Sequence, residues 1–316
     1  MEIFNKQTKI NFLGWRKVAA VISTVLIVIG VGSYVQKGLN LGIDFTGGTL
    51  IEVGYSGAAD IEGIRTLLNS EGYEKATVQN FGSAKDVMIR VPLTEDTSSA
   101  GLSEEIVKVL KKSDENVELR RVEFVGPQFG KELVEKGSLA LLYALGLVMI
   151  YVAVRFEWKF GIGSVAALVH DVLVTVGAFA VLQMEFSLPV LAAVLAVIGY
   201  SLNDTIVVFD RIRENFRKLR ETDTVEIMNV SVNQTLPRTI LTSVTTMLVL
   251  LALFFFGGEV LRGFSVALII GVLVGTYSSI FIASPVVLAL GVSKDDLIPE
   301  KVEKEGADQP DVELLP

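Results

Sequence analysis

Asp204 is an acidic residue inside an apolar stretch, in the segment GYSLNDTIVVFDRIREN that covers residues 199–215. It precedes Asp210, where the charged cluster begins, by six residues, or roughly 9 Å along a helix. A charged carboxylate at membrane depth costs roughly 2.5–3.5 kcal/mol, so its presence indicates a titratable group with a function. The alternative is a polar side chain that only forms hydrogen bonds with neighbouring helices, although the neutral amide of Asn203 would suffice for that role.

Arg238 begins the next apolar stretch, in the segment TLPRTILTSVTTM. Because Arg238, Thr242 and Thr245 are spaced at i, i+4 and i+7, they form a polar stripe on one helical face. Such a stripe should face other helices or water and not lipid. A pair between Asp204 and Arg238 would form a two-state element, since protonation of the carboxylate would release the arginine. The alternative is that Arg238 extends to the cytoplasmic surface as a topology signal.

His170 and Asp171 are neighbours in another apolar segment, GSVAALVHDVLVTVG, and His170 is the only histidine in the chain. Histidine titrates near neutral pH, so the two residues are candidates for a proton relay. Consecutive helix positions point about 100° apart, so both cannot face one partner squarely, and hydrogen bonding between helices is the alternative. We expect no metal site, because a lone histidine in a chain without cysteine lacks a set of spaced ligands.

A ladder of small residues marks the last apolar stretch. Ala267, Gly271, Gly275 and Ser279 recur at every fourth position. Such a face lets two helices approach closely, so we expect these residues to serve helix packing.

Other motifs of catalysis are incomplete. The segments DFTGG and FGGE lack the lysine and the strand–loop–helix frame of a phosphate-binding loop. No Ser-His-Asp, paired-carboxylate or nucleotide-binding set is present either, so we expect neither an enzyme nor a cofactor. The net charge of −8 gives no ground for nucleic-acid binding, which requires a basic face.

The elements that must position these residues are membrane spans. The chain has 316 residues, of which 51% are hydrophobic and 20% charged, and its apolar residues are segregated into blocks. A bilayer core of about 30 Å requires about 20 apolar residues in a helix. The blocks predict a polytopic α-helical membrane protein with a basic loop at 210–237. Its six predicted spans are residues 16–35, 136–154, 162–182, 188–209, 238–256 and 264–290.

Lysine and arginine are distributed unevenly over the short connections. One side carries the basic residues of 6–17, 155–159 and 210–238, whereas the loops around 183–187 and 257–263 carry only Arg262. The positive-inside rule therefore predicts that both termini, residues 1–15 and the acidic tail 291–316, are cytoplasmic and that the large insert is periplasmic. We expect the tail to be disordered. A cleaved signal peptide is the alternative for the first span, but no clear small-x-small cleavage site precedes Gln36.

The insert between the first two spans, residues 36–135, predicts a compact α+β domain. The segment LNLGIDFTGGTLIEVGY predicts a strand with a glycine-rich bend, and apolar spacing predicts helices within ADIEGIRTLLNSEG and SEEIVKVLKK. The segments ATVQNF and DVMIRVPL flank a hairpin signal, and VELRRVEFV predicts a last strand. The order β-α-β-β-α-β indicates a ferredoxin-like sandwich with two helices on one face of an antiparallel sheet.

Five long blocks of this sequence resemble the SecF family of bacterial Sec protein translocase subunits. These blocks are NLGIDFTGGTLIEV, VEFVGPQFGKEL, RFEWKFGIGSVAALVHDVLVTVGAF, IGYSLNDTIVVFDRIREN and LPRTILTSVTTM. The resemblance runs from the first span to about residue 290 and includes the layout of six spans with one exported insert.

The resemblance implies an inner-membrane protein with an RND-like fold that pairs with SecD. It implies action beside the SecYEG channel, with other accessory membrane proteins of the translocase, after the ATP-driven motor SecA has started translocation. Proton flow would then move the exported domains and draw preprotein outward through the bilayer. On this resemblance the proton-pathway residues are Asp204 and Arg238, their neighbours are Asn203 and Thr242, and the role of His170 and Asp171 stays open.

Two other functions stay open at this point. One is half of an RND-type antiporter for small solutes or lipids, although the insert at 36–135 leaves little room for a substrate cleft beyond a compact sandwich. The other is a passive scaffold that stabilises the channel without ion chemistry. Replacement of Asp204 by Asn separates the scaffold from the proton-driven subunit.

Overall fold

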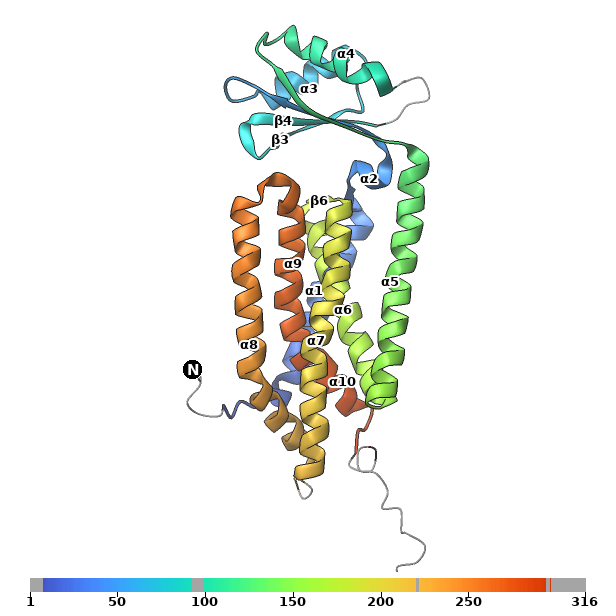
Figure 1. Cartoon of the computed structure of the whole chain (residues 1–316), viewed down its shortest axis with the longest axis vertical. Coiled ribbons are helices and arrows are strands. Elements are labelled where there is room, and N and C mark those ends of the chain that lie inside the picture. The colour runs from blue at the N-terminus through green and yellow to red at the C-terminus, as the bar shows by residue number, and fades with distance from the viewer. Residues whose placement is uncertain (1–7, 93–98, 220–221, 294–295, 297–316) are drawn as a thin grey trace, which may run out of the picture.

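The structure, a computed structural model of the chain, describes residues 8–92, 99–219, 222–293 and 296. Within that part of the chain, six long apolar helices form a bundle, and a sheet-containing domain lies at one end of it (Figure 1). The predicted membrane protein with six spanning helices and one inserted α+β domain is therefore confirmed. The N-terminal segment 1–15 falls partly outside the described residues, and the acidic tail 291–316 falls largely outside them.

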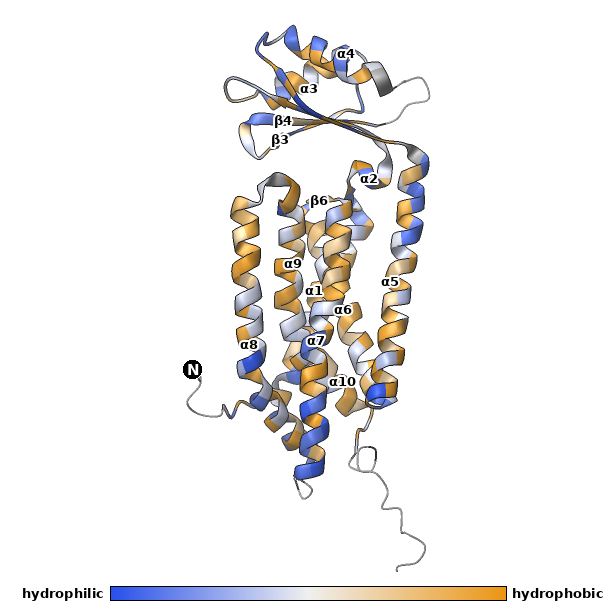
Figure 2. Ribbon diagram, in the orientation of Figure 1, coloured by the Kyte–Doolittle hydropathy of each residue, from blue (hydrophilic) through white to orange (hydrophobic). Residues whose placement is uncertain are grey.

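The helices are longer than the apolar stretches that predict them. The first five spans are α1 (Arg16–Lys37), α5 (Pro127–Arg155), α6 (Trp158–Leu182), α7 (Leu188–Lys218) and α8 (Thr224–Phe256), and a 3-10 turn, η1 (Leu13–Trp15), precedes α1. The sixth consists of α9 (Gly258–Ser278), a π-helical turn (Ser279–Ala283) and α10 (Ser284–Ala289). Figure 2 shows apolar residues along the bundle and hydrophilic residues at the C-terminal end of α7.

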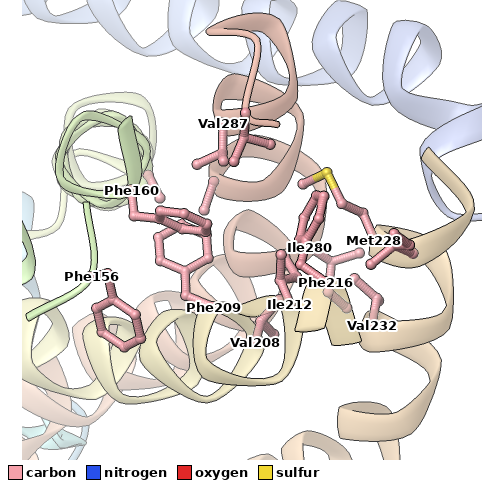
Figure 3. Packing of buried hydrophobic residues seen from close by; sticks show 14 of the residues in the cluster. Phe156, Phe160, Val208, Phe209, Ile212, Phe216, Met228, Val232, Ile280 and Val287 are labelled. Carbon is pink, nitrogen blue, oxygen red and sulfur yellow. The ribbon is translucent and has the colours of Figure 1, made fainter. Parts of the chain in front are cut away.

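The segment predicted as a basic loop, residues 210–237, is instead mostly helical. The side chain of Asp223 begins α8 by accepting a hydrogen bond from Val225 N at 3.1 Å. Apolar side chains from the extensions of α7 and α8 are buried against the end of the last span, and this tertiary packing stabilises helix there (Figure 3). They include Ile212, Phe216, Met228 and Val232, which lie in one cluster with Ile280 of the last span. A count of charges does not reveal this apolar face.

The inserted domain contains a four-stranded antiparallel sheet in the order β3-β4-β2-β5. The first and third strands of the domain are therefore central, as in the predicted ferredoxin-like sandwich. The helices α3 and α4 cover one face of the sheet, and its other face is turned toward the bundle (Figure 1). The elements are β2 (Gly48–Gly54), α3 (Ile61–Ser70), β3 (Thr77–Phe81), β4 (Ser83–Val91), α4 (Ser99–Lys111) and β5 (Glu118–Val125).

A junction that the sequence did not predict joins this domain to the bundle. The strand β1 (Asn40–Leu41) pairs in parallel with β6 (Glu185–Phe186), which lies between α6 and α7. One helical turn, α2 (Ile43–Thr46), follows β1, so the predicted bent strand is instead β1, α2 and β2. The turn ends at Gly47 and Gly48, whose φ angles of 70° and 135° favour glycine.

Polar contacts hold the inserted domain at this junction. Arg90, on β4, forms an ion pair with Glu185 at 2.8 Å and donates a hydrogen bond to Leu41 O at 3.1 Å. Asp44 Oδ2 accepts a hydrogen bond from Leu188 N, the first residue of α7, at 2.7 Å. Burial raises the pKa of Glu185, and the Arg90 guanidinium opposes that shift. The inserted domain and the start of α7 are thus bonded to the same short junction.

The small-residue face of the last span packs mainly against α7. A Cβ atom on Gly271 would lie 2.0 Å from Val197 Cγ2, and one on Gly275 would lie 3.0 Å from Ser201 Cβ. Ala267 is fully buried in an apolar cluster with side chains of α7. Ser279 is buried where the π-helical turn begins, and its hydroxyl donates to Thr276 O at 3.1 Å.

Candidate functional site

Asp204 lies in the middle of α7, with 3% of its surface exposed. It is sixteen residues past Leu188, roughly 24 Å along the helix, and so lies inside the apolar part of the bundle. Its Oδ2 atom is buried and has no hydrogen-bond partner among the described residues. A charged oxygen without a partner is costly in such surroundings, and this one is free to bind a proton.

Arg238 lies on α8 with an exposed side chain. Among the described residues its guanidinium forms no ion pair within 4.0 Å, although its electrostatic field acts on Asp204. It borders a cavity of about 440 Å³ between α5, α7 and α8, which Arg155, Asp210 and Arg211 also line. The structure therefore holds Asp204 and Arg238 apart, with an electrostatic interaction but no ion pair between them.

Asn203 and Thr242 form no hydrogen bond with Asp204 in the described part of the chain. Asn203 is exposed on α7, because consecutive helix positions point in different directions. The Thr242 hydroxyl donates to the backbone of its own helix, to Thr239 O at 2.9 Å. Thr245 is exposed as well, so the polar stripe from Arg238 to Thr245 borders the outer surface of the bundle.

His170 and Asp171 are both buried and lie hydrogen-bonded to each other, with 3.0 Å between Nδ1 and Oδ1. Their other contacts reach different helices, as expected for consecutive positions. His170 Nε2 lies 3.1 Å from Ser23 Oγ on α1. Asp171 Oδ2 accepts hydrogen bonds from Ser201 on α7 at 2.5 Å and from Ser278 on α9 at 2.8 Å. The pair therefore joins α6 to α1, α7 and α9.

Ser23, Ser278 and Tyr277 belong to this polar network, and sequence analysis missed all three. Ser23 Oγ lies 3.0 Å from the Tyr277 hydroxyl, which donates to Ala19 O at 2.8 Å. Their only signal was a hydroxyl inside a predicted span. Ser23 and Tyr277 are 254 positions apart, so spacing along one helix could not pair them. Within the described residues, no three His, Asp or Glu side chains lie together as candidate metal ligands.

Two family profiles match this sequence. The profile described as "Protein export membrane protein SecD/SecF, C-terminal" matches residues 105–293, more than half of the chain. That range contains Asp204, Arg238 and the His170–Asp171 pair. The profile described as "SecD/SecF GG Motif" matches residues 35–59, which include the junction between α1 and the inserted domain.

Curated relatives named "Protein translocase subunit SecF" are similar over almost their whole length. The relative from Vibrio alginolyticus is 51% identical over 97% of this chain and 98% of its own. The one from Pseudomonas aeruginosa is also 51% identical, over 95% of this chain and 98% of its own. The relative from Escherichia coli O157:H7 is 46% identical over 96% and 94% of the two chains.

Solved structures of SecDF share this fold. A crystal structure of SecDF from Thermus, a translocon-associated membrane protein, is similar with a TM-score of 0.82 and 38% identity over 91% of this chain. SecDF in a super-membrane-facing form is similar with a TM-score of 0.69. This chain spans 39% of the length of those solved chains, so more than half of each has no counterpart here.

Proposed function

Since this chain belongs to the SecF family of protein translocase subunits, we propose that it couples proton flow to protein export. In this proposal it pairs with a SecD-type partner and works beside the SecYEG channel. Proton binding inside the membrane changes the packing of its spans, and the inserted domain moves with them. That movement draws preprotein outward after the ATP-driven motor SecA has started translocation.

The proposed location is the bacterial inner membrane, with both termini cytoplasmic and the inserted domain periplasmic. The distribution of basic side chains supports this orientation. Arg155, Lys159 and Arg211 lie at one end of the bundle, where α5 ends, α6 begins and the extension of α7 runs on. At the opposite end, the short connections carry only Arg262.

One observation carries the proposed proton coupling: the Oδ2 atom of Asp204 is buried and has no hydrogen-bond partner in the part of the chain that the structure describes. A residue retained only as an interhelical hydrogen-bond acceptor would have its acceptors occupied. Asp171, on the neighbouring helix, has its Oδ2 occupied in that way by Ser201 and Ser278. The Asp204 oxygen has a vacant bonding position instead, and a proton is the simplest ligand that neutralises it.

The proposed partner is supported by polar residues on the outside of the bundle. Asn203, Arg238 and Thr245 are exposed on spans α7 and α8. Polar and charged side chains within a membrane rarely face lipid, because burying them in hydrocarbon is unfavourable. A second set of spans, such as a SecD-type partner supplies, would cover these side chains and exclude lipid from the neighbourhood of Asp204.

In the proposed cycle, Asp204 and Arg238 alternate between two arrangements. With Asp204 charged, Arg238 moves toward it; with Asp204 protonated, Arg238 is released to the position seen here. One proton that crosses about 100 mV supplies about 2.3 kcal/mol. That amount is comparable to the difference of a few kcal/mol between two conformations of a protein, so proton binding can switch which packing prevails.

Export into membrane vesicles tests this proposal. The full chain, co-assembled with its SecD-type partner and the channel, is compared with Asp204→Asn and Asp204→Glu with and without a proton gradient. We expect the gradient to increase export in the wild-type complex, to give no increase with Asp204→Asn, and to keep part of its effect with Asp204→Glu, which restores a titratable group.

Asp210→Asn is the matched control, because it makes the same change on the same helix at an exposed position. It should respond to the gradient as the wild type does. Equal stimulation of export in Asp204→Asn and wild type would refute the proton-coupling role and leave a passive scaffold.

A further inference from the structure

The His170–Asp171 pair lies in a chain of hydrogen bonds whose donors can be assigned one after another. The chain begins at Ala19 O, a carbonyl oxygen that can only accept. The Tyr277 hydroxyl lies 2.8 Å from it, so the single phenol proton is donated there. Ser23 Oγ lies 3.0 Å from the Tyr277 oxygen and must then donate its own proton to it.

The same assignment of donors determines which nitrogen of the His170 ring carries a hydrogen. Ser23 has used its proton, and His170 Nε2 lies 3.1 Å from Ser23 Oγ. The Nε2 atom must therefore carry a hydrogen and donate it to Ser23. A neutral imidazole carries one hydrogen only, so in a neutral ring the Nδ1 atom would be a bare acceptor.

Asp171 then requires one further proton. Its Oδ1 lies 3.0 Å from Nδ1, and its Oδ2 already accepts hydrogen bonds from Ser201 and Ser278. A bare Nδ1 and a carboxylate oxygen are both acceptors and cannot bond. A proton must lie between them, either on Nδ1, which makes an imidazolium, or on Oδ1, which makes a carboxylic acid.

We infer that the His170–Asp171 pair is a second proton-binding site of this chain, which holds one proton between Nδ1 and Oδ1 and thereby fixes α1 to α6 and α9. Asp171 is fully buried, and the bound proton leaves the pair with no net charge. A bare carboxylate next to a neutral imidazole would instead place an uncompensated charge in the bundle.

Loss of this proton has a defined structural result. The ring would adopt the tautomer with hydrogen on Nδ1, and Nε2 would need to accept from Ser23. Ser23 could then no longer donate to Tyr277, so the link between α1 and α9 would lose one hydrogen bond. The inserted domain follows α1 directly through β1, so the proton on this pair influences the span that leads to the domain.

Few titratable or charged side chains lie near the pair on the helices that surround it. Tyr277 faces it from α9, and Asp204 lies on α7 one turn beyond Ser201. The helix α1 contributes Ser23 and carries its charges at its ends. The helix α5 meets α6 near Gly161, where Tyr151 and Arg155 lie, about two turns or more from His170.

The sole histidine of the chain makes a direct test available. The full chain, produced without a histidine tag and with ¹⁵N-labelled histidine, is placed in lipid bilayers near neutral pH, and the two ring nitrogens are observed by solid-state NMR. We expect Nε2 to be protonated. A neutral ring with hydrogen on Nδ1 and a bare Nε2 is the tautomer that an unprotonated Asp171 selects, and it would overturn the inference.

Tyr277→Phe separates proton binding from packing. Without the phenol, Ser23 is free to donate to Nε2, so at one alkaline pH a larger share of the rings should have a bare Nε2 than in the wild type. Tyr143→Phe, at an exposed tyrosine of α5, should leave that share unchanged. Equal shares in the two variants would show that the hydrogen-bond chain does not hold the proton.

The link to movement of the inserted domain rests on the proposed proton coupling, but the NMR result does not. Loss of gradient-dependent export in Asp204→Asn, together with a bare Nε2, would remove this second site and keep the proposed function. A protonated Nε2 in a chain whose export ignores the gradient would do the reverse.

Discussion

Two carboxylates lie inside the bundle of spans, and their surroundings differ. Asp171 is fully buried, and both of its oxygens have partners from other side chains. Asp204 is almost as buried, but its Oδ2 has no partner among the described residues. A group with all its bonds made is held in place, whereas a group with a vacant position can exchange a proton at little structural cost. The two residues therefore suit different tasks.

Tyr55, in the inserted domain, provides a test of buried titration outside the membrane. Burial and the charge of Asp114 raise the pKa of Tyr55 from 10.0 to about 12. The unfolded chain loses this proton first, so the phenol contributes stability that is present below about pH 10 and lost as the pH rises through about 12. Thermal unfolding measured at about pH 8 and about pH 11 should show that stability decreases less between these two pH values in Tyr55→Phe than in the wild type. Equal decreases would contradict the raised pKa.

The candidate residues were predictable from the sequence only where their type conflicts with their surroundings. Asp204, Arg238 and His170 were identified because charged or titratable groups are costly inside an apolar stretch. The exposure of Asn203 and Arg238 was not predictable, because hydropathy does not say which face of a span meets another helix. The partners of His170 were not predictable either, since Ser23 is 147 positions away in the chain.

At the scale of the elements, the approach of α9 to α7 depends on glycine. A Cβ atom on Gly271 would lie within 3.0 Å of the Cβ and both Cγ atoms of Val197, so rotation of the valine side chain would not remove the clash. We expect Gly271→Ala to lower the stability of the chain in detergent by about 1–3 kcal/mol through overpacking. Thermal or denaturant unfolding of the purified chain measures this change.

Gly199→Ala is the matched control. Gly199 lies on α7, and a Cβ atom there would meet nothing within 4 Å. It should leave stability unchanged or raise it slightly, since alanine favours helix over glycine. Similar stabilities of Gly271→Ala and Gly199→Ala would show that the ladder of small residues does not set the distance between α7 and α9.

The spans themselves were predictable, but their extensions were not. Apolar length identified the six helices that, among the described residues, are long and apolar enough to cross a membrane, because the bilayer sets that length. The helical ends of α7 and α8 carry many charges, and their apolar face covers only a narrow stripe that includes Phe216 and Met228. Such a stripe stabilises helix only through the packing partner it finds in the fold, here near Ile280 of the last span.

At the scale of the whole molecule, the inserted domain is held to the bundle by the contacts of Arg90. Its ion pair with Glu185 is largely shielded from solvent, with side chains 13% and 25% exposed. We expect Arg90→Ala to weaken the docking of the domain by about 1–3 kcal/mol, because Glu185 is left without its charged partner.

The chain has no cysteine, so a pair of introduced cysteines permits specific spin labelling. With labels at the exposed positions Lys85 and Leu182, the distance distribution should broaden in Arg90→Ala. Arg120→Ala, which removes a more exposed ion pair with Asp86 inside the domain, is the control and should keep the narrow distribution. A narrow distribution in Arg90→Ala would show that other contacts hold the domain.

The architecture of the inserted domain was predictable, but its attachment was not. Alternating and helical apolar patterns gave the strand and helix order, and that order restricts the sheet to few topologies. The pairing of β1 with β6 involves two residues on each side, too few for a strand pattern. In the sequence, Arg90 resembles any solvent-facing arginine of a strand, because its partner Glu185 lies far along the chain, in the connection between α6 and α7.

We propose that Asp204 carries the proton that crosses the membrane part of this protein. Proton uptake into vesicles that contain the full chain and its SecD-type partner, driven by an imposed gradient, tests it most directly. We predict uptake in the wild type and in Asp210→Asn, reduced uptake in Asp204→Glu, and uptake at the level of empty vesicles in Asp204→Asn. Uptake by Asp204→Asn at the wild-type rate would contradict the claim.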